Sequence, residues 1–521
     1  MEHLVNRPDF LSARQAVDRI GDGASVAIVG SGGGVMEPDV LLAAIEARFL
    51  ETGHPRDLTI VHALGIGDAR ARGLTHLAHE GLVAKVIGGH WSWSPAMQRL
   101  AAEEKISAYA LPAGVIGQLL RESGARRPGL ITRVGLGSFV DPRLDGGRVN
   151  QRATDPVVEL IQLDGEDYLR YLPLHIDVAL IRGSASDARG NVTCAEEPAI
   201  LDAESVALAA RGNGGIVIAQ VGRIVPTGSL EPWLVHLPHT VISSIVEAPE
   251  QWQTYAGSFN SDFVTSTQVQ AEASTGTSTL VDVRTIIARR AALEARRGTL
   301  INVGFGMSAM VVDALAHEGI LDDFTLVIEQ GAVGGHPASG DLFGVSRFPE
   351  AILSSTRQFD FFATGSIDTC FLGMAEVDSR GNVNVSHIGK TTVGPGGFID
   401  IVHGSKRAVF CGPFTAKGLE VAVTASGLSI VNEGAIPKFV DSVGHVTFSA
   451  QQALAEGRSA LYITERAVFE LTPDGLVLRE LAPGIDLERD VLQHMRFRPI
   501  VHDPELMPAS CFEPLRAPVS P

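Results

Sequence analysis

Glu329 is the residue of this chain whose surroundings best suit chemistry. It ends the apolar segment TLVI and is followed by QGAVGG, so that Gly331, Gly334 and Gly335 leave backbone amides unshielded by side chains. A carboxylate beside such donors can act as a nucleophile, while the donors stabilise an oxyanion. The same carboxylate can instead have a structural role, in which it caps the amides of its own loop.

A dinucleotide-binding turn is the main alternative for this segment. Gly304, Gly306 and Ala309 have the spacing GxGxxA after an apolar segment, and Glu329 follows Ala309 by 20 residues. That distance suits an acid that binds a ribose. Such an acid does not need a glycine-rich segment directly after it, however, and this favours a nucleophile over a nicotinamide site.

Other nucleophiles and metal ligands lack their usual patterns. No GxSxG segment is present, which argues against a serine hydrolase. The histidines show no HExxH or comparable spacing, so we expect no metal. The four cysteines are too far apart for a CxxC pair, and we expect buried thiols. His336 is the histidine that we expect to face substrate, because it follows the glycines of the Glu329 segment.

The composition indicates an acidic globular protein. Its 521 residues carry a formal net charge of −18 and include 56 glycines. No positive field is available to hold nucleic acid or a membrane surface, so any anionic ligand must be bound locally. The N-terminus lacks a basic region followed by an apolar stretch, and no run of 18 apolar residues occurs later. We therefore expect a cytoplasmic protein.

Short β-branched segments alternate with amphipathic helical segments throughout the chain. SVAIVG (25–30), followed by a helical segment led by Pro38, is one example. The alternation predicts an α/β fold with open parallel sheets. A polar, Ser/Thr-rich stretch between about 250 and 280 is the best candidate for a boundary, which predicts domains 1–275 and 276–521.

Three segments of the first half recur in the same order in the second half. The alignment pairs Ala63 with Glu329, so that only the second half carries the acid. Features found in one half alone are candidates for chemistry, and the end of a strand is where open α/β sheets place their ligands. The pairs are SVAIVGSG (25–32) with TLINVGFG (299–306), LTIVHALG (58–65) with FTLVIEQG (324–331), and DVALIRGSASDARGNV (177–192) with DTCFLGMAEVDSRGNV (368–383).

These residues resemble the family I coenzyme A transferases, in the single-chain form that fuses an α-like and a β-like half. EQGAVGG is similar to the glutamate signature of that family, and NVGFGM (302–307) is similar to its Asn-Leu-Gly-Ile-Gly-Met turn. The segment at 381–402, which contains GPGGFIDIV, resembles its Gly-Gly loop. In the first half, VIGGHWSWSPAM, VGLGSFVDPR and IRGSASDARGN resemble the acetate or propionate transferase branch.

The resemblance implies two related open α/β domains that face each other across a cleft, in a homo-oligomer that is a dimer or a tetramer. It implies a ping-pong reaction in which coenzyme A moves from an acyl-CoA to a free carboxylic acid through a thioester on Glu329. Coenzyme A is then a substrate, and no cofactor is permanently bound. Asn302 would orient the carboxylate. The residues that we expect to bind the oxyanion or coenzyme A are Gly396, Gly397, Gly331, Gly334 and Asn302.

The expected substrate pocket departs from the family pattern. Related transferases carry a Gln, which contacts substrate, where this chain has Ala113. We therefore expect a pocket that is not tuned to acetoacetate. The sequence does not separate transfer from hydrolysis, so an acyl-CoA thioesterase with the same nucleophile is an alternative, beside a dinucleotide-binding protein. The pocket residues that we expect are Ala113, His336, Gly32 and Gly33.

Overall fold

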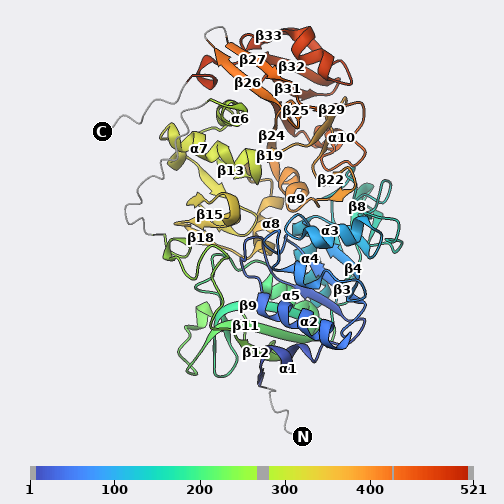
Figure 1. Ribbon diagram of the computed structural model, residues 1–521, viewed down its shortest axis with the longest axis vertical. Coiled ribbons are helices and arrows are strands. Elements are labelled where there is room, and N and C mark those ends of the chain that lie inside the picture. Colours follow the sequence, from blue (N-terminus) through green and yellow to red (C-terminus); the bar gives the residue numbers. More distant parts are fainter. Residues whose placement is uncertain (1–6, 267–280, 425–426, 514–521) are drawn as a thin grey trace. The chain divides into compact units, whose positions relative to one another are not determined.

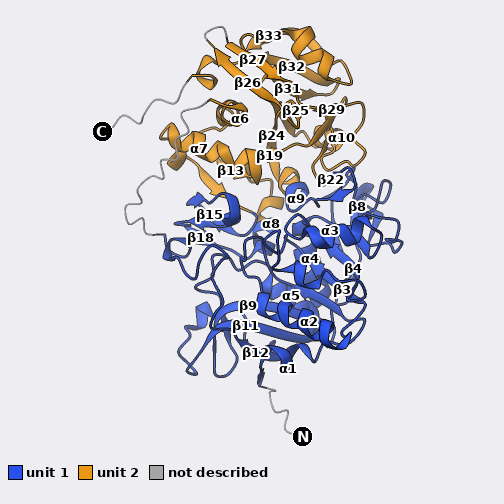
Figure 2. Ribbon diagram, in the orientation of Figure 1, with its two compact units in different colours: residues 1–267, 329–360, 386–400 blue, residues 268–328, 361–385, 401–521 orange. Residues whose placement is uncertain are grey.

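The computed structural model describes residues 7–266, 281–424 and 427–513, and these form two compact units (Figure 2). Unit 1 contains residues up to 267 together with 329–360 and 386–400, and unit 2 contains the remainder. Two segments of the second half of the chain thus belong to the same unit as the first half. The predicted boundary between residues 275 and 276 lies outside the described residues, and that division of the chain stays a prediction.

The main sheet of unit 1 is parallel along its whole path, as the alternation of segments predicted. Its strand β9 (Val178–Asp187) is buried at every residue, as is usual for a parallel strand covered on both faces. Strands β9, β11 and β12 lie side by side in Figure 1. The strand order is β1 (Asp9–Phe10), β12 (Ser244–Glu247), β11 (Ile216–Val225), β9, β2 (Ser25–Ile28), β3 (Leu58–His62), β4 (Val83–Gly88) and β5 (Ser107–Ala110), with β10 (Val192–Thr193) paired to β9.

Helices of unit 1 cover this sheet. Buried apolar side chains of the first three helices form one core cluster with alternate residues of the strands, while α4 and α5 pack on each other and α5 packs on β9. Unit 1 also has an antiparallel sheet of β6 (Leu130–Thr132), β8 (Glu166–Tyr171) and β7 (Val158–Leu163). The helices are α1 (Ala13–Val17), α2 (Asp39–Thr52), α3 (Pro95–Ala102), α4 (Ala113–Gly124) and α5 (Ala203–Gly212).

Unit 2 has a mixed sheet with its own core. Pairing is parallel from β14 to β30 and antiparallel from β30 to β32, and helices α6 (Val283–Ala292) and α7 (Met310–His317) contribute side chains to the core. The strand order is β14 (Thr325–Val327), β13 (Leu300–Val303), β19 (Ile367–Gly373), β24 (Ser405–Cys411), β30 (Ser459–Ile463), β31 (Ala467–Thr472), β32 (Gly475–Leu481) and β33 (Ile500–Leu506).

Smaller elements complete the two units. Helices α8 (Ser355–Ala363) and α9 (Phe398–His403) begin in segments assigned to unit 1. The short strands of unit 1 are β15 (Ala332–Val333), β16 (His336–Pro337), β17 (Ser346–Arg347), β18 (Ala351–Ile352), β22 (His387–Ile388) and β23 (Thr391–Thr392). Unit 2 also has α10 (Ala450–Ala455), β20 (Glu376–Asp378), β21 (Val383–Asn384), β25 (Thr415–Ala416), β26 (Glu420–Thr424), β27 (Gly427–Asn432), β28 (Ile436–Pro437) and β29 (Phe439–Val440).

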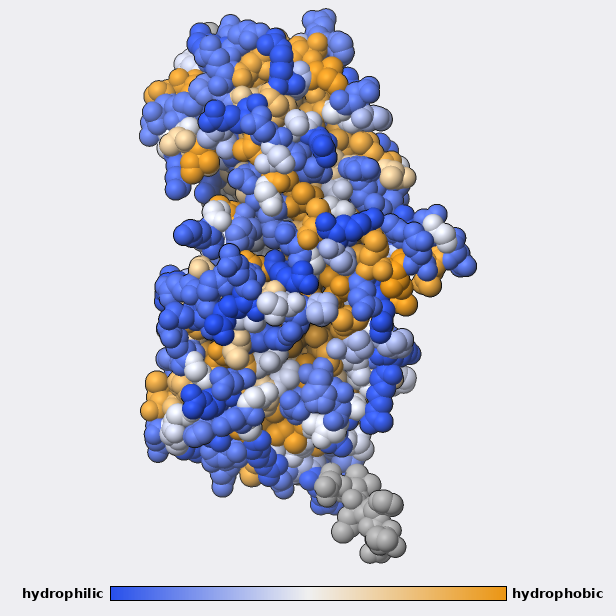
Figure 3. Space-filling view, turned by 90° about the vertical axis from the view of Figure 1, so that its right-hand side faces the viewer, coloured by the Kyte–Doolittle hydropathy of each residue, from blue (hydrophilic) through white to orange (hydrophobic). Residues whose placement is uncertain are grey.

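Hydrophilic side chains predominate on the face drawn in Figure 3, with apolar side chains between them. Within the described ranges, no helix has both the length and the apolar character needed to cross a bilayer.

Corresponding strands have the same order in both sheets. The neighbours β3, β2, β9 and β11 of unit 1 match β14, β13, β19 and β24 of unit 2. When the residue partners are followed from strand to strand in each sheet, Ile60 on β3 occupies the same place in its sheet as Leu326 on β14 does in the other. Three residues beyond them lie Ala63 and Glu329, so the alignment of these two positions is confirmed.

The alignment of the first pair of segments was wrong by one residue. It paired Gly30 with Gly304, whereas the structure makes Val29 the counterpart of Gly304. The N–H of Val29 donates to the carbonyl of Leu180 (3.1 Å), and the N–H of Gly304 donates to that of Phe371 (2.8 Å) at the equivalent place. The error arose because the glycines alone determined the match, and the two turns use their glycines differently.

The third pair of segments folds into the same loop in both units. Oδ1 of Asp187 accepts the backbone N–H groups two and four residues ahead (2.9 and 3.0 Å), and Oδ2 accepts from Nδ2 of Asn191 (3.0 Å). Asp378 repeats this pattern with Asn382, with all three distances at 3.0 Å. The shared D-x-x-GNV text is therefore a structural motif, in which a carboxylate closes the loop on itself.

We expect Asp187→Ala and Asp378→Ala to destabilise the unit that carries each residue by about 1 to 3 kcal/mol, because partly buried N–H groups lose a charged acceptor. Hydrogen exchange of the loop amides, followed by mass spectrometry, would report the loss locally. Asp474→Ala, at an exposed turn, is the control. Equal protection of the loop amides in the aspartate variants and the control would contradict the motif's role.

Candidate active site around Glu329

Glu329 lies two residues beyond β14, in a segment that belongs to unit 1. Its side chain is half-buried. Nε2 of the buried Gln330 lies 3.4 Å from Oε1 of Glu329 and 3.4 Å from Oγ of Ser31. Oε1 of Gln330 has no hydrogen-bond partner among the described residues. The Glu329 segment is thus joined to the glycine turn that follows β2.

Gly397 touches the carboxylate directly. A Cβ atom at position 397 would lie 2.0 Å from Oε2 of Glu329 and 3.0 Å from the ring of Phe359, so no other residue fits there without displacing these groups. The backbone N–H of Gly397 donates to the Glu329 carboxylate. Two residues that the sequence predicted for the site, one as nucleophile and one as amide donor, are therefore in contact.

Burial raises the pKa of Glu329 to about 7, although hydrogen bonds from Gly397 and Gln330 act in the opposite direction. Loss of water around the carboxylate is the larger effect, because few polar groups replace the lost hydration. Near neutral pH the group is then divided between acid and anion. A poorly hydrated carboxylate with two donors, the Gly397 N–H and Nε2 of Gln330, suits a nucleophile better than it suits a loop cap.

Gly396, the other predicted donor of the Gly-Gly loop, is held differently. Its N–H donates to the carbonyl of Gly89 (2.8 Å), and its carbonyl accepts from the N–H of Ala113 (2.8 Å). The amide of Gly396 is thus already used, which leaves Gly397 as the donor of the pair. Ala113 is the first residue of α4 and is buried. The structure therefore brings the predicted pocket position beside the Gly-Gly loop.

Gly331 and Gly334 support the path of the chain after Glu329. A Cβ atom at position 331 would lie 2.0 Å from the carbonyl oxygen of Leu353, and one at position 334 would lie 2.7 Å from the side chain of Glu350. Both glycines have positive φ, of 118° and 71°. They allow β15 to pair with β18. Whether their amides also bind an oxyanion or coenzyme A stays a prediction.

The predicted pocket glycines Gly32 and Gly33 are closely packed. A Cβ atom at position 32 would lie 2.0 Å from the indole of Trp93, and one at position 33 would lie 2.1 Å from the carbonyl oxygen of Asp341. His336 is half-buried on β16, opposite Arg347 of β17. A contact of these residues with substrate stays a prediction.

Asn302 lies on β13 in unit 2 and holds the end of β14. Its Nδ2 donates to the carbonyl of Val327 (2.8 Å), two residues before Glu329. Its Oδ1 is buried and has no partner within the described ranges. Asn302 therefore fixes the strand from which Glu329 emerges, and a direct effect on the carboxylate stays a prediction.

Two polar residues near the Gly-Gly loop were not among the site residues predicted from the sequence. Oδ2 of the buried Asp400 accepts the N–H of Gly114 in α4 (3.1 Å). His90 is half-buried, burial lowers its pKa to about 4, and its Nδ1 has no partner among the described residues. A Cβ atom on Gly396 would lie 3.6 Å from the His90 ring. Both residues lie in segments that resemble the family, Asp400 in GPGGFIDIV and His90 in VIGGHWSWSPAM, but nothing in the residue type or spacing distinguished them from their neighbours.

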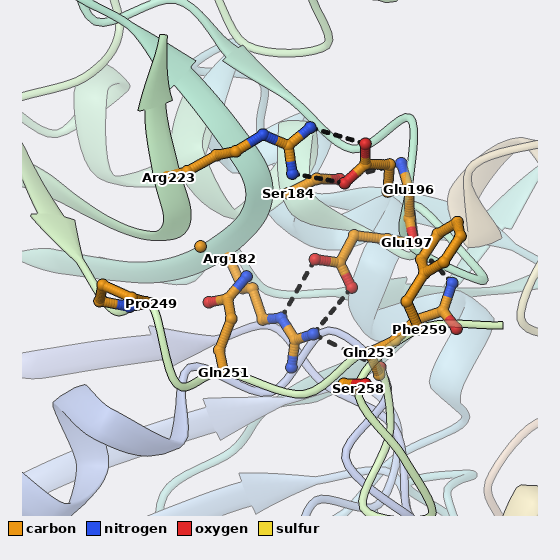
Figure 4. A pocket seen from close by; sticks show the side chains of 11 residues that line it. Arg182, Ser184, Glu196, Glu197, Arg223, Pro249, Gln251, Gln253, Ser258 and Phe259 are labelled. Carbon is orange, nitrogen blue, oxygen red and sulfur yellow. Dashed lines mark hydrogen bonds and ion pairs between the residues drawn. The ribbon is translucent and has the colours of Figure 1, made fainter.

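A separate pocket of about 390 Å³ lies in unit 1 (Figure 4). Its charged groups pair with each other: Arg182 with Glu197 (3.0 Å) and Arg223 with Glu196 (2.6 Å). None of the predicted site residues lines it. In the described part of the chain, no group of three or more His, Cys, Asp or Glu side chains is arranged to hold a metal ion, and the four cysteines are buried, as predicted.

Known proteins share this fold over nearly its whole length. Residues 10–248 match the family model for coenzyme A transferase. The acetate CoA-transferase YdiF of Escherichia coli (strain K12) is 41% identical over 503 residues, which cover 96% of this chain and 94% of that protein. The caffeate CoA-transferase of Acetobacterium woodii is 40% identical over 500 residues, which cover 94% and 95% of the two chains.

A solved structure agrees with these relatives. The acyl-CoA transferase YdiF of E. coli O157:H7, in a thioester complex with CoA, matches with a TM-score of 0.92 and 38% identity over 98% of this chain and 97% of that one. The chain belongs to the coenzyme A transferase family, in its fused single-chain form. It is an enzyme for which coenzyme A is a substrate rather than a resident cofactor. This assignment favours a transferase over a dinucleotide-binding protein.

We expect Glu329→Gln to raise the melting temperature at pH 8 and to leave it nearly unchanged at pH 4. The unfolded carboxyl ionises near pH 4.5, whereas burial delays ionisation in the folded protein to about pH 7. The wild-type protein therefore loses stability from this group as the pH rises between these values, and the amide variant does not. Scanning calorimetry at several pH values measures the difference.

Glu250→Gln, which makes the same substitution at an exposed position, is the control. A difference between Glu329→Gln and wild type that is constant from pH 4 to pH 8 would contradict the raised pKa of Glu329.

Proposed function

We propose that this enzyme transfers coenzyme A from an acyl-CoA to a free carboxylic acid by a ping-pong reaction through a thioester on Glu329. The observation that carries the proposal is the poorly hydrated carboxylate of Glu329, with its pKa near 7, against the N–H of Gly397. The absence of an acid from the equivalent position, Ala63, adds support.

The reaction needs only carboxylate and thiolate chemistry. The Glu329 carboxylate attacks the thioester carbonyl, the C–S bond breaks, and an acyl-glutamyl anhydride and the CoA thiolate form. The thiolate then attacks the glutamyl carbonyl, so that the donor acid leaves as its carboxylate and a glutamyl-CoA thioester remains. An acceptor carboxylate reverses both steps and restores Glu329. No net proton transfer is required.

Gly397 has a defined part in this scheme. Its N–H contacts the Glu329 carboxylate, so that it can stabilise the negative charge on a Glu329 oxygen when the CoA thiolate attacks the glutamyl carbonyl. Phe359 covers the same glycine with an apolar ring. Exclusion of water matters because the anhydride retains the activation of the thioester, and hydrolysis would lose it.

Trapping of the intermediate tests the role of Glu329. We expect incubation with an acyl-CoA, followed by borohydride or hydroxylamine, to modify Glu329 alone, as mapped by peptide mass spectrometry. Glu329→Ala should abolish both the modification and the transfer. Turnover without modification of Glu329 would sink the proposal. Release of coenzyme A at the same rate with and without an added carboxylate would identify a thioesterase instead.

The acyl pocket determines which carboxylic acids the enzyme accepts. Relatives are named for acetate and for caffeate, and we propose that this enzyme does not favour acetoacetate. The support is Ala113, which lies beside the Gly-Gly loop and stands where the resemblance to the family I transferases implies a Gln that contacts substrate. A homo-oligomer and a cytoplasmic location, both expected from the sequence, are kept as proposals.

We expect Ala113→Gln to shift kcat/KM toward acetate and acetoacetate by up to about tenfold relative to longer acids, because one hydrogen bond is worth about 0.5 to 1.5 kcal/mol. A panel of acyl-CoA donors and acceptor acids measures the shift. Ala113→Leu adds similar bulk without an amide and is the control. An equal shift in the Leu variant, or a wild-type preference for acetoacetate that Ala113→Gln leaves unchanged, would contradict the assignment.

A further inference from the structure

The N-terminus of α4 is capped by residues that are distant in the sequence. Pro112, at the N-cap position, makes no side-chain hydrogen bond to the helix. The N–H of Ala113 donates to the carbonyl of Gly396 (2.8 Å), and that of Gly114 donates to Oδ2 of Asp400 (3.1 Å). The N–H of Val115 also donates to the Asp400 carboxyl. The amides that a helix leaves unpaired at its start are thus used by the segment 396–400.

These contacts enclose the glycine that touches Glu329. Gly397 lies between Gly396 and Asp400, and both of these are attached to the first turn of α4. Phe359 packs on the turn as well, because a Cβ atom at position 114 or at position 397 would lie 2.6 or 3.0 Å from its ring. The position of the Gly397 N–H on the carboxylate therefore depends on how firmly the segment 396–400 is held to α4.

We propose that Asp400 is a positioning residue, which holds the Gly397 N–H on the Glu329 carboxylate by capping α4. The inference rests on the proposed role of Glu329 and adds a residue that was not among those predicted for the site. Asp400 acts through the turn and not on the reacting atoms. It is buried, so that its contacts with α4 are shielded from water.

Because Asp400 can ionise, it should give kcat a pH dependence that a purely structural residue would not give. Burial, and then the nearby charge of Glu329, raise the pKa of Asp400 to about 8. The groups that face it are Glu329, Tyr171 and the amide N–H groups of α4. Below pH 8 a neutral Asp400 still accepts these amides through its carbonyl oxygen. Above pH 8 it ionises and places a second negative charge beside the developing oxyanion.

The chain offers a matched control in Asp202. This residue is also a buried aspartate at the start of a helix, α5, and burial raises its pKa to about 7. Its Oδ2 has no hydrogen-bond partner among the described residues. Within the described ranges, no hydrogen bond or ion pair joins it to Glu329 or Gly397. A Cβ atom on Gly117, one turn beyond the first residues of α4, would lie 3.7 Å from the Cβ of Asp202. Substitutions at Asp202 therefore report the effect of removing a buried aspartate that packs on α4 but accepts none of its first amides.

The experiment compares Asp400→Ala and Asp400→Asn with Asp202→Ala and Asp202→Asn. We expect Asp400→Ala to lower kcat roughly 10- to 100-fold, as a small displacement of a catalytic group does, while KM for the acyl-CoA changes by less than about twofold. Asp400→Asn retains an acceptor oxygen and should lose less than about threefold in kcat at pH 7. We expect kcat of the wild-type enzyme to decline above about pH 8, as Asp400 ionises, and we expect no such decline in Asp400→Asn. Both Asp202 variants should keep the wild-type pH profile.

The result that would overturn the inference is an Asp400→Ala variant with the kcat and pH profile of Asp202→Ala. If Asp400→Ala does not fold, the test depends on Asp400→Asn. A decline of kcat above pH 8 in this variant that equals the wild-type decline would also overturn the inference. Labelling of Glu329 by acyl-CoA separates this outcome from failure of the proposed function. No label in the wild-type enzyme means that the nucleophile is wrong. A label at the wild-type rate in Asp400→Ala means that only the positioning role is wrong.

Discussion

The close approach of the Gly397 backbone to the Glu329 carboxylate is the constraint on which the rest of the site depends. No side chain fits at position 397, where a Cβ atom would lie 2.0 Å from a carboxylate oxygen. The hydrogen bond from the Gly397 N–H replaces part of the lost hydration, although too little to keep the acid at its ordinary pKa. The nucleophile is thus poorly hydrated and yet directed by a hydrogen bond.

Such a contact requires two segments of the second half to be held by the first. The segments 329–360 and 386–400 belong to the same unit as residues up to 267, and the first turn of α4 receives the Gly-Gly loop. The duplicated fold supplies an equivalent strand end in each sheet. Only one of these ends carries the acid, and the other, at Ala63, has its carbonyl packed where a Cβ of Gly89 would lie.

The half-buried Glu329 and the buried Asp400 oppose stability and favour reactivity. Burial raises the pKa of Glu329 to about 7 and that of Asp400 to about 8. A fold selected only for stability would avoid this pair, because each group loses hydration without gaining a cation. Local conflicts of this kind are typical of functional sites. The Asp187 and Asp378 loops show the opposite case, in which every carboxylate contact supports the fold.

The sequence by itself determined the α/β fold, the relation between Ala63 and Glu329, and the family, because periodicity and contiguous motifs are local signals. It also indicated Gly397 as a donor. It did not distinguish Gly396, whose amide bonds to Gly89, from Gly397, and it missed Asp400 and His90. Only the tertiary structure decided these points. The contact between Asp400 and Gly114 joins residues 286 positions apart, and the direction of an amide or the loss of water around an acid depends on such contacts rather than on spacing along the chain.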